Sequence, residues 1–199
     1  MINLRTLRLV LWARVALAVA GAAFLYLRRP SQPVASGPAI TLGAPFTLTG
    51  TDGKPFSSEA LQGRPHVIFF GFTHCPDVCP TTLARLAKLR RDLGKGDDAF
   101  DIVLVSVDPE RDTPAELARY ITLFRTPVIA LTGTPADVAK VTKAFGIFAE
   151  KVPDTTGGYT VDHSTQALLF NRDGSFGGTI TMEEADAPAL QKLGNIIAS

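Results

Sequence analysis

Two cysteines and one histidine are the residues of this chain whose types and spacing could do chemistry. Its only cysteines, Cys75 and Cys79, stand in the stretch HCPDVCP with three residues between them. The sequence predicts a buried strand before them and a helix after them, so both thiols lie at a helix N-terminus. There, unpaired backbone N–H groups and the helix dipole can lower a cysteine pKa from about 8.5 to as little as about 3.5. We therefore expect both sulfurs to ionise readily.

The separation of the two cysteines brings both side chains to one face if the turn between them is helical. Pro76 and Pro80 restrict that turn, and Pro80 suits the first helical position because its missing N–H has no intrahelical partner there. Two sulfurs in this arrangement can reach each other or one metal ion. The alternative, that they are only small buried apolar side chains, fits a lone cysteine better than this pair.

The three histidines of the chain have different predicted roles. His66 opens a predicted buried strand and is expected to be structural. His74 directly precedes the first cysteine, and because adjacent side chains rarely point at one ion, we assign it to support of the loop or tuning of the thiolates. His163, in VDHS, follows a Gly-Gly loop that packs beside the cysteine turn in a thioredoxin-like fold. We predict His163 as the third ligand, in preference to a buried structural histidine.

Two thiolates and one imidazole form a soft set of ligands. Thiolates suit Cu(I), zinc or iron–sulfur centres, and imidazole also suits Cu(II). A structural zinc site usually needs four ligands and the chain has no further cysteine, so one copper ion, Cu(I) or Cu(II), fits best. Asp162 is predicted to hydrogen-bond the loop or to orient the neighbouring histidine. Asp77, between the cysteines, is predicted to serve partner docking or to form the turn.

The elements that must position these residues alternate between strands and helices. Apolar runs predict buried strands, and apolar residues at helical spacing predict helices, two of which begin with a Thr-Pro-Ala-acid N-cap. This order is that of an α/β, thioredoxin-like domain with a central mixed sheet flanked by helices. The predicted elements are a hairpin at 46–56, strands at 66–72, 101–107 and 128–131, helices starting near Pro80, Thr113 and Thr134, a Gly-rich loop at 153–164, a hairpin at 166–181 and a closing helix through Leu190, Leu193 and Ile197.

Two of these elements are additions to the basic thioredoxin pattern. The hairpin at 46–56 is predicted to be an N-terminal extension. The helix near 114–124 and the strand at 128–131 are predicted to be an insertion.

The start of the chain is apolar and basic. An apolar run spans residues 9–27, is broken only by Arg14, and approaches the roughly 20 residues that cross a bilayer. Ala18-Val19-Ala20 resembles a cleavage site, so a signal peptide is the alternative. We predict a membrane anchor over 1–29, a Pro- and Ser-rich linker over 30–39 and one domain over 40–199.

The distribution of charge bears on location and on partners. Five of the 20 basic residues lie in the leader, so 15 remain against 19 acidic residues and the rest of the chain carries about −4. This balance excludes a nucleic-acid partner, which requires a basic face. The leader arginines favour a cytoplasmic N-terminus, which places the body outside the cytoplasm. A short anchor without a long presequence is more typical of a bacterial inner-membrane protein than of a mitochondrial one, so we predict a single-pass protein of the bacterial inner membrane whose soluble domain faces the periplasm.

Four stretches of the sequence together resemble the Sco/SenC family of copper metallochaperones. The resemblance implies a membrane-anchored, thioredoxin-like protein of cytochrome c oxidase assembly, with Cys75, Cys79 and His163 as the copper ligands. The matching stretches, which extend over most of residues 40–193, are GFTHCPDVCPTTL (71–83), VSVDPERDTP (105–114), LTGTP (131–135) and GGYTVDHS (157–164).

The resemblance also implies partners and an activity. Copper would pass to the dinuclear copper centre of oxidase subunit II, or the protein would reduce that subunit's cysteines, with other copper chaperones or thiol reductants as further partners. We expect a binding and transfer protein rather than a turnover enzyme.

Three other functions are alternatives to a copper chaperone. In a thiol–disulfide oxidoreductase, Cys75 and Cys79 would exchange with a partner's disulfide. Residues 154–187 contain no proline, whereas thioredoxin-type enzymes place a cis-proline there, which counts against this alternative. An inert membrane-tethered module and a peroxidase are weaker alternatives, the peroxidase because no arginine is singled out to activate peroxide.

Overall fold

The structure is a computed structural model that describes residues 42–154 and 157–199, together with scattered positions between 3 and 21. The chain divides into two units, Met1–Ile40 and Thr41–Ser199. The predicted anchor at 1–29 lies mostly outside the described residues, and the predicted linker at 30–39 lies wholly outside them. Among the described residues, no helix has the length and apolar character needed to cross a membrane.

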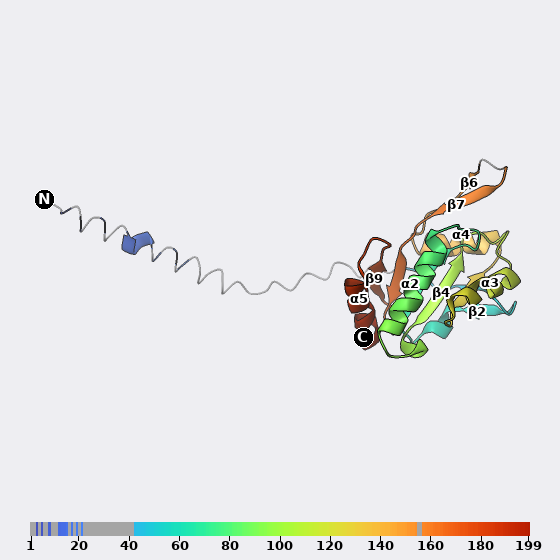
Figure 1. The fold of residues 1–199 in the computed structure, drawn as a ribbon, viewed down its shortest axis with the longest axis horizontal. Helices are drawn as coiled ribbons and strands as arrows, with labels where there is room; N and C mark the ends of the chain where they lie inside the picture. Colours follow the sequence, from blue (N-terminus) through green and yellow to red (C-terminus); the bar gives the residue numbers. More distant parts are fainter. Residues whose placement is uncertain are drawn as a thin grey trace. The chain divides into compact units, whose positions relative to one another are not determined.

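The second unit is built on a seven-stranded mixed sheet with the strand order β2-β1-β5-β4-β3-β8-β9. Its centre is parallel, whereas both edges are antiparallel hairpins. This arrangement confirms the predicted mixed sheet and thioredoxin-like fold, which Figure 1 shows with helices packed against the sheet. The strands are β1 (Thr47–Gly50), β2 (Pro55–Ser57), β3 (His66–Gly71), β4 (Asp101–Ser106), β5 (Ile129–Thr132), β8 (Ala167–Phe170) and β9 (Phe176–Ile180).

Four α-helices cover the sheet, and two of them, α3 and α4, start at the threonine caps that the sequence predicts. Thr113 and Thr134 accept hydrogen bonds from the third backbone N–H of α3 and of α4, and a proline follows each of them. This satisfies N–H groups that have no partner within the helix. The helices are α2 (Val78–Asp92), α3 (Pro114–Ile121), α4 (Pro135–Ala144) and α5 (Asp186–Ala198), with short 3₁₀ turns η1 (Ser58–Leu61), η2 (Asp97–Ala99) and η3 (Thr122–Phe124).

Helix α2 begins two residues before the position that the sequence predicts. Pro80 is therefore its third residue and not its first, which is tolerated because the third N–H also lacks an intrahelical partner. Leu83, Leu86 and Leu89 are buried against the sheet as their spacing predicts. Gly94 has a φ of +65°, so the helix ends in the left-handed conformation that glycine favours.

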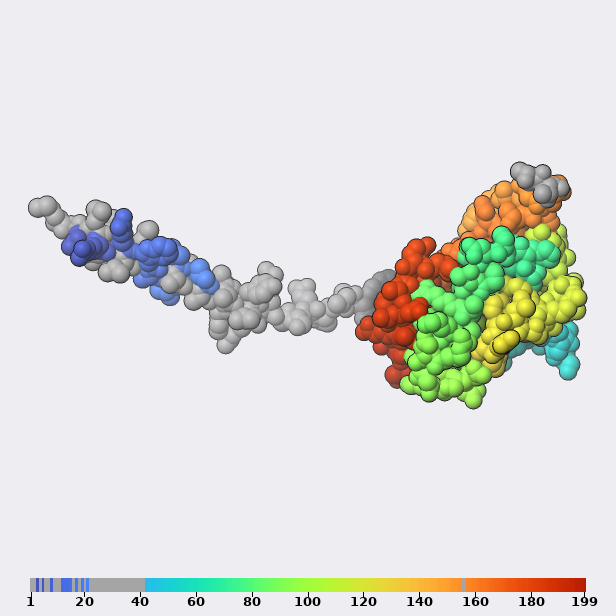
Figure 2. All heavy atoms as spheres, viewed as in Figure 1, coloured from blue at the N-terminus to red at the C-terminus, as the bar shows by residue number. Residues whose placement is uncertain are grey.

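Helix α5 packs alongside α2. Arg85 of α2 donates from Nε to the Asp186 carboxylate at 3.0 Å and from Nη1 to the carbonyl oxygen of Thr181 at 2.8 Å. Figure 2 shows α5 (red) beside α2 (green) on the surface of the domain. The helix that carries the second cysteine is thus held by both the sheet and α5.

The segment predicted as a Gly-rich loop at 153–164 contains a strand, so that prediction is wrong. Strands β6 (Ala149–Pro153) and β7 (Tyr159–His163) form a separate two-stranded antiparallel sheet. Figure 1 shows this hairpin projecting from the rest of the domain. Most of β6 is exposed, so it lacks the apolar run by which buried strands are found in a sequence. His163 ends β7 and therefore has a defined place beside the body of the domain.

Candidate metal centre

The two cysteines lie at the junction of strand β3 and helix α2. Cys75 is half-buried in the turn before the helix, whereas Cys79 is its second residue and is fully buried; both are free thiols. The backbone N–H of Cys79 donates to the sulfur of Cys75 at 3.4 Å. The three-residue spacing therefore folds the first sulfur over the start of the helix, as the sequence predicts.

His163 comes from β7 and meets the two sulfurs. Its Nε2 lies 3.4 Å from Sγ of Cys79, and the ligand atoms of Cys75, Cys79 and His163 all lie within 4.8 Å of one another. Bonds from thiolate or imidazole to a metal ion are about 2.0–2.3 Å long, so a cluster of this size can share one ion. The structure thus brings together the three residues predicted to be ligands.

The imidazole of His163 is held in an orientation suited to ligation. Its Nδ1–H donates to the carbonyl oxygen of Ser164 at 2.8 Å, which leaves Nε2 without a proton and facing the sulfurs. Phe69 and Phe72 contact the ring edge-on, at centroid distances of 6.2 and 5.7 Å. Burial lowers the pKa of His163 below its ordinary value, so near pH 7 the ring is neutral, which is the form that binds metals.

The expectation that both thiols ionise readily is wrong for Cys79. Burial raises its pKa well above the ordinary value, and the neighbouring Cys75 raises it further. Desolvation of a thiolate in this fully buried position outweighs the favourable helix N-terminus. Cys79 is therefore a neutral thiol when no metal is bound, and a metal ion must displace its proton.

Gly71, at the end of β3, makes room for the buried sulfur. A Cβ at this position would lie 3.0 Å from Sγ of Cys79 and 2.7 Å from the ring of Phe69. The requirement is steric, and sequence reasoning missed it. Its one signal is a glycine inside an otherwise apolar strand, which often marks close approach of another group.

His74 and Asp77, two residues predicted to support the site, lie around the cluster rather than in it. His74 is 52% exposed, and its Nδ1 lies 2.9 Å from Oγ1 of Thr73 and 4.0 Å from the Asp112 carboxylate. This placement agrees with support of the loop. Asp77 stands at the N-cap of α2 but makes no capping hydrogen bond with its side chain; it accepts one from Thr81 at 3.1 Å.

Asp162 does not orient the histidine by a hydrogen bond, which was one of its two predicted roles. It is exposed on the opposite face of β7, where it pairs in register with Glu150. Neighbouring residues of a strand point to opposite faces, so its carboxylate is directed away from the ring. The carbonyl of Ser164 takes the orienting role.

Asp112 fixes the cysteine loop to the sheet, and sequence reasoning missed this residue. Its fully buried carboxylate accepts hydrogen bonds from the Thr73 N–H at 3.1 Å, from the Thr73 hydroxyl at 2.6 Å and from the Ser106 hydroxyl at 2.6 Å. Burial raises its pKa. Asp112 therefore links Thr73, two residues before Cys75, to Ser106 at the end of β4 by hydrogen bonds.

Arg111 clamps the β6–β7 hairpin onto the loop after β4. Its guanidinium lies 3.8 Å from the ring centroid of Tyr159 and 5.8 Å from that of Phe72, and its Nη1 donates to the Tyr159 carbonyl at 2.9 Å. The buried Asp108 pairs with this guanidinium and accepts a hydrogen bond from the Tyr159 hydroxyl at 2.8 Å. These contacts fix the strand that carries His163.

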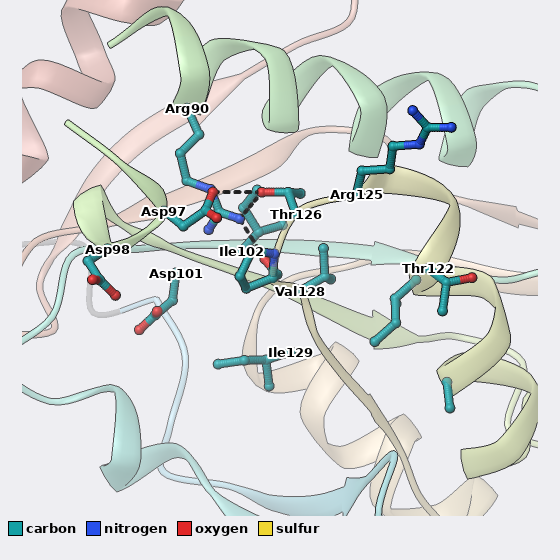
Figure 3. A pocket seen from close by; sticks show the side chains of 13 residues that line it. Arg90, Asp97, Asp98, Asp101, Ile102, Thr122, Arg125, Thr126, Val128 and Ile129 are labelled. Atoms are coloured by element: carbon teal, nitrogen blue, oxygen red, sulfur yellow. Dashed lines mark hydrogen bonds and ion pairs between the residues drawn. The ribbon is translucent and has the colours of Figure 1, made fainter. Parts of the chain in front are cut away.

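A cavity of about 390 Å³ lies at the other end of the sheet, where β4 and β5 begin. Figure 3 shows Arg90 and Asp97 linked to Thr126 on one side and Arg125 apart from them on the other. The cavity is lined by neither cysteine nor histidine. It is therefore separate from the cluster at the C-terminal end of β3.

The fold and the cluster together define a thioredoxin-like protein with a Cys-Cys-His site able to bind one metal ion. Residues 34–198 match the SCO1/SenC family, and the chain belongs to that family.

Individual relatives agree with this assignment. The mitochondrial protein SCO2 of Saccharomyces cerevisiae is 35% identical over 158 residues, which are 78% of this chain and 52% of that protein. The SCO2-like protein of Rickettsia felis is 35% identical over 159 residues, covering 76% of this chain and 78% of the relative. The chain spans 66%, 52% and 46% of the length of curated relatives from Stutzerimonas stutzeri, yeast and Arabidopsis thaliana.

A solved structure, ScoI of Bradyrhizobium japonicum with copper bound, is 41% identical to this chain. It superposes with a TM-score of 0.71 over 78% of this chain and 99% of that one. The shared fold therefore includes nearly all of that copper-bound protein.

Proposed function

We propose that this protein is a copper chaperone of cytochrome c oxidase assembly that holds one copper ion, Cu(I) or Cu(II), through Cys75, Cys79 and His163. The observation that carries the proposal is that these three ligand atoms lie within 4.8 Å of one another. Two sulfurs and one imidazole suit copper in both oxidation states. Related proteins from Bradyrhizobium japonicum and yeast have been solved with copper bound, which supports the choice of metal.

The different burial of the two sulfurs suits transfer rather than permanent storage. Cys79 is fully buried, whereas Cys75 is half-buried at the surface. A thiolate of an acceptor can approach the ion from the Cys75 side while Cys79 and His163 still hold it. Because a three-coordinate ion has room for a further ligand, the acceptor sulfur enters before a donor sulfur leaves. The protein then acts by exchange of ligands and is not a turnover enzyme.

Copper binding is coupled to the release of protons. Burial keeps Cys79 as a neutral thiol and His163 as a neutral imidazole. The histidine therefore needs no deprotonation near neutral pH, whereas Cys79 must lose a proton when its sulfur binds the ion. Affinity consequently falls as the pH falls, because protons compete with the metal for this sulfur.

We further propose the acceptor and the location. The acceptor is the dinuclear copper site of cytochrome c oxidase subunit II, which receives copper or has its cysteines reduced in preparation. Other copper chaperones or thiol reductants supply the copper or the electrons. The apolar run at 9–27 anchors the protein in a bacterial inner membrane and the copper-binding domain faces the periplasm.

Titration of the reduced protein with Cu(I) and with Cu(II) tests the proposal. We expect one equivalent of either ion to bind to the wild-type protein, and we expect Cys75→Ser and Cys79→Ser to weaken binding strongly. His74→Ala is the matched control, because this imidazole adjoins Cys75 but points toward Thr73. Failure to bind one equivalent of copper would contradict the proposal.

A thiol–disulfide oxidoreductase is the second candidate. It is favoured by one observation, that Cys75 and Cys79 are both free and lie side by side at a helix N-terminus, with the first of them accessible. In that reaction the thiolate of Cys75 would attack a partner's disulfide, and Cys79 would then resolve the mixed disulfide. Rapid reduction of a protein disulfide by His163→Ala, without copper, would favour this candidate over the chaperone.

A further inference from the structure

The cavity at the start of β4 and β5 has an apolar floor that solvent can reach. Its volume is about 390 Å³. Ile121, Val128 and Ile129 line it, and each of them packs against the core but stays half-exposed. Figure 3 shows Val128 and Ile129 between the acidic residues on the left and Thr122 on the right. An exposed apolar hollow of this kind commonly marks a site of interaction.

The two sides of the cavity carry opposite charges. On one side, Asp101 is held by Arg64 at 2.7 Å, whereas the side chain of Asp98 is 98% exposed and lies 3.8 Å from the same guanidinium. On the other side lies Arg125, which Figure 3 shows apart from the acidic residues. Among the described residues, none pairs with the guanidinium of Arg125. The cavity thus offers an available anion on one side and an available cation on the other.

Beside the cavity, an apolar side chain projects from the surface. Leu123 is 68% exposed, and Thr122 before it and Arg125 two residues after it both line the cavity. Between them Phe124 is buried and packs edge-on against Tyr120 at a centroid distance of 5.3 Å, which holds the turn η3 in place. Arg125 has a φ of +50°, a left-handed conformation that glycine favours. A leucine and an arginine are therefore presented together on a fixed turn.

We propose that this face joins two copies of the chain about a two-fold axis. Leu123 of each copy enters the cavity of the other, and Arg125 of each copy pairs with Asp98 of the other. Every contact of a two-fold interface occurs twice, so the surface must complement itself. An apolar projection beside an apolar hollow, with a cation and an anion on opposite sides, meets this requirement. Burial of the leucine drives association, and the ion pairs set the orientation.

The interface leaves the metal centre free in both copies. Cys75, Cys79 and His163 cluster beyond the end of β3 at Gly71, whereas the cavity lies at the start of the parallel strand β4. The inference therefore does not rest on the proposed function, and one copper ion per chain should bind whether or not the protein is a dimer.

Exchange of the two charges tests the inference in the full-length protein, with the mass of the particle measured by analytical ultracentrifugation. We expect the wild type to change from one chain to two as its concentration rises. Asp98→Arg places arginine against arginine across the axis, and Arg125→Asp places aspartate against aspartate, so each variant alone should remain a single chain. In an equimolar mixture of the two variants every arginine again faces an aspartate, and the two-chain particle should return.

Two further variants separate this interface from other causes. Leu123→Asp should abolish the dimer without lowering the melting temperature, because the leucine is exposed in the single chain. Glu183→Arg is the matched control for Asp98→Arg, since Glu183 is also exposed but lies outside the cavity; it should leave the dimer intact.

Three results would overturn the inference. The first is a wild-type protein that stays a single chain at every concentration. The second is a dimer that persists in Asp98→Arg, Arg125→Asp and Leu123→Asp, because another part of the chain would then hold it. The third is a mixture of the two charge variants that fails to associate. Failure of the wild type to bind copper would instead overturn the proposed function and leave this interface unaffected.

Discussion

Nε2 of His163 lies 3.4 Å from the sulfur of Cys79, although 84 residues separate them in the chain. The cysteine is fixed at the junction of α2 and β3, and β3 is buried along its whole length. The histidine reaches it from a hairpin whose outer strand is mostly exposed. The site is therefore made by docking this hairpin against the body, and residues that secure the docking should matter as much as the ligands.

Arg111→Lys tests the docking of the hairpin. Lysine keeps the charge but loses the planar stack on Tyr159 and the geometry of the bond to its carbonyl. We expect a cost of about 1–3 kcal/mol in the free energy of unfolding. Hydrogen exchange in β7 should become faster, and copper affinity should fall.

Lys151→Met is the control for Arg111→Lys. Lys151 lies over the same tyrosine ring and pairs with Glu110, but it is exposed. Exposed ion pairs contribute little to stability, so this variant should bind copper like the wild type. Equal effects of the two substitutions on stability and on copper affinity would show that Arg111 has no special role in docking the β6–β7 hairpin.

Asp112→Asn should loosen the cysteine loop. An amide has only one oxygen to accept hydrogen bonds, whereas the carboxylate of Asp112 accepts from the Thr73 N–H, the Thr73 hydroxyl and the Ser106 hydroxyl. Loss of such bonds costs about 1.5–3 kcal/mol of unfolding free energy, measurable by urea denaturation. Ser106→Ala removes one of the three bonds to Asp112 and the bond from the Asp108 N–H to the Ser106 hydroxyl, but it leaves both bonds to Thr73 in place. Hydrogen exchange of the Thr73 N–H should therefore become faster in Asp112→Asn and stay unchanged in Ser106→Ala; the opposite order would contradict this account.

Gly71→Ala should disturb the buried sulfur directly. The added methyl would lie 3.0 Å from Sγ of Cys79 and 2.7 Å from the Phe69 ring. Overpacking of this kind costs about 1–3 kcal/mol in unfolding free energy, and copper affinity should fall with it. Gly194→Ala, in α5, meets no atom within 4 Å and should stabilise the helix by about 0.5–1 kcal/mol. A Gly71→Ala protein as stable as wild type would show that the site has spare room.

Acid should weaken the metal-free fold through its buried histidines. Burial lowers the pKa of His66 and of His163 in the folded protein below the ordinary value of 6.5, which applies to the unfolded chain. Between these two values the unfolded chain therefore binds more protons than the folded protein. The stability present above about pH 6.5 is then lost as the pH falls through this window. Urea denaturation between pH 7.5 and 5.5 measures it. The loss should be smaller in His163→Gln, and an identical loss in that variant would rule out a contribution from this residue.

The fold could be predicted in large part because its signals are local. The run HVIFFGF is buried on both faces as a central strand must be, and the Thr-Pro pairs at 113–114 and 134–135 carry the caps that start α3 and α4. The cluster of Cys75, Cys79 and His163 was predicted from a spacing and from the expected place of one loop. These features depend on residues close in sequence or on a recurrent topology.

What could not be predicted depends on burial and on contacts between distant segments. Strand β6 is exposed and charged, so it carries no apolar pattern. The raised pKa of Cys79 follows from its burial, which a position at a helix N-terminus does not reveal. Asp112 bonds to Thr73, 39 residues away, and Arg111 to Tyr159, 48 residues away, and no periodicity links such pairs.

Electron paramagnetic resonance of the Cu(II)-loaded protein tests the central claim most directly, with His163→Ala beside the wild type. We predict that the wild-type spectrum shows coupling to one imidazole nitrogen together with the strong covalency of thiolate ligation, and that the nitrogen coupling disappears in His163→Ala. Identical spectra from the two proteins would show that this ring does not bind copper, and would contradict the account.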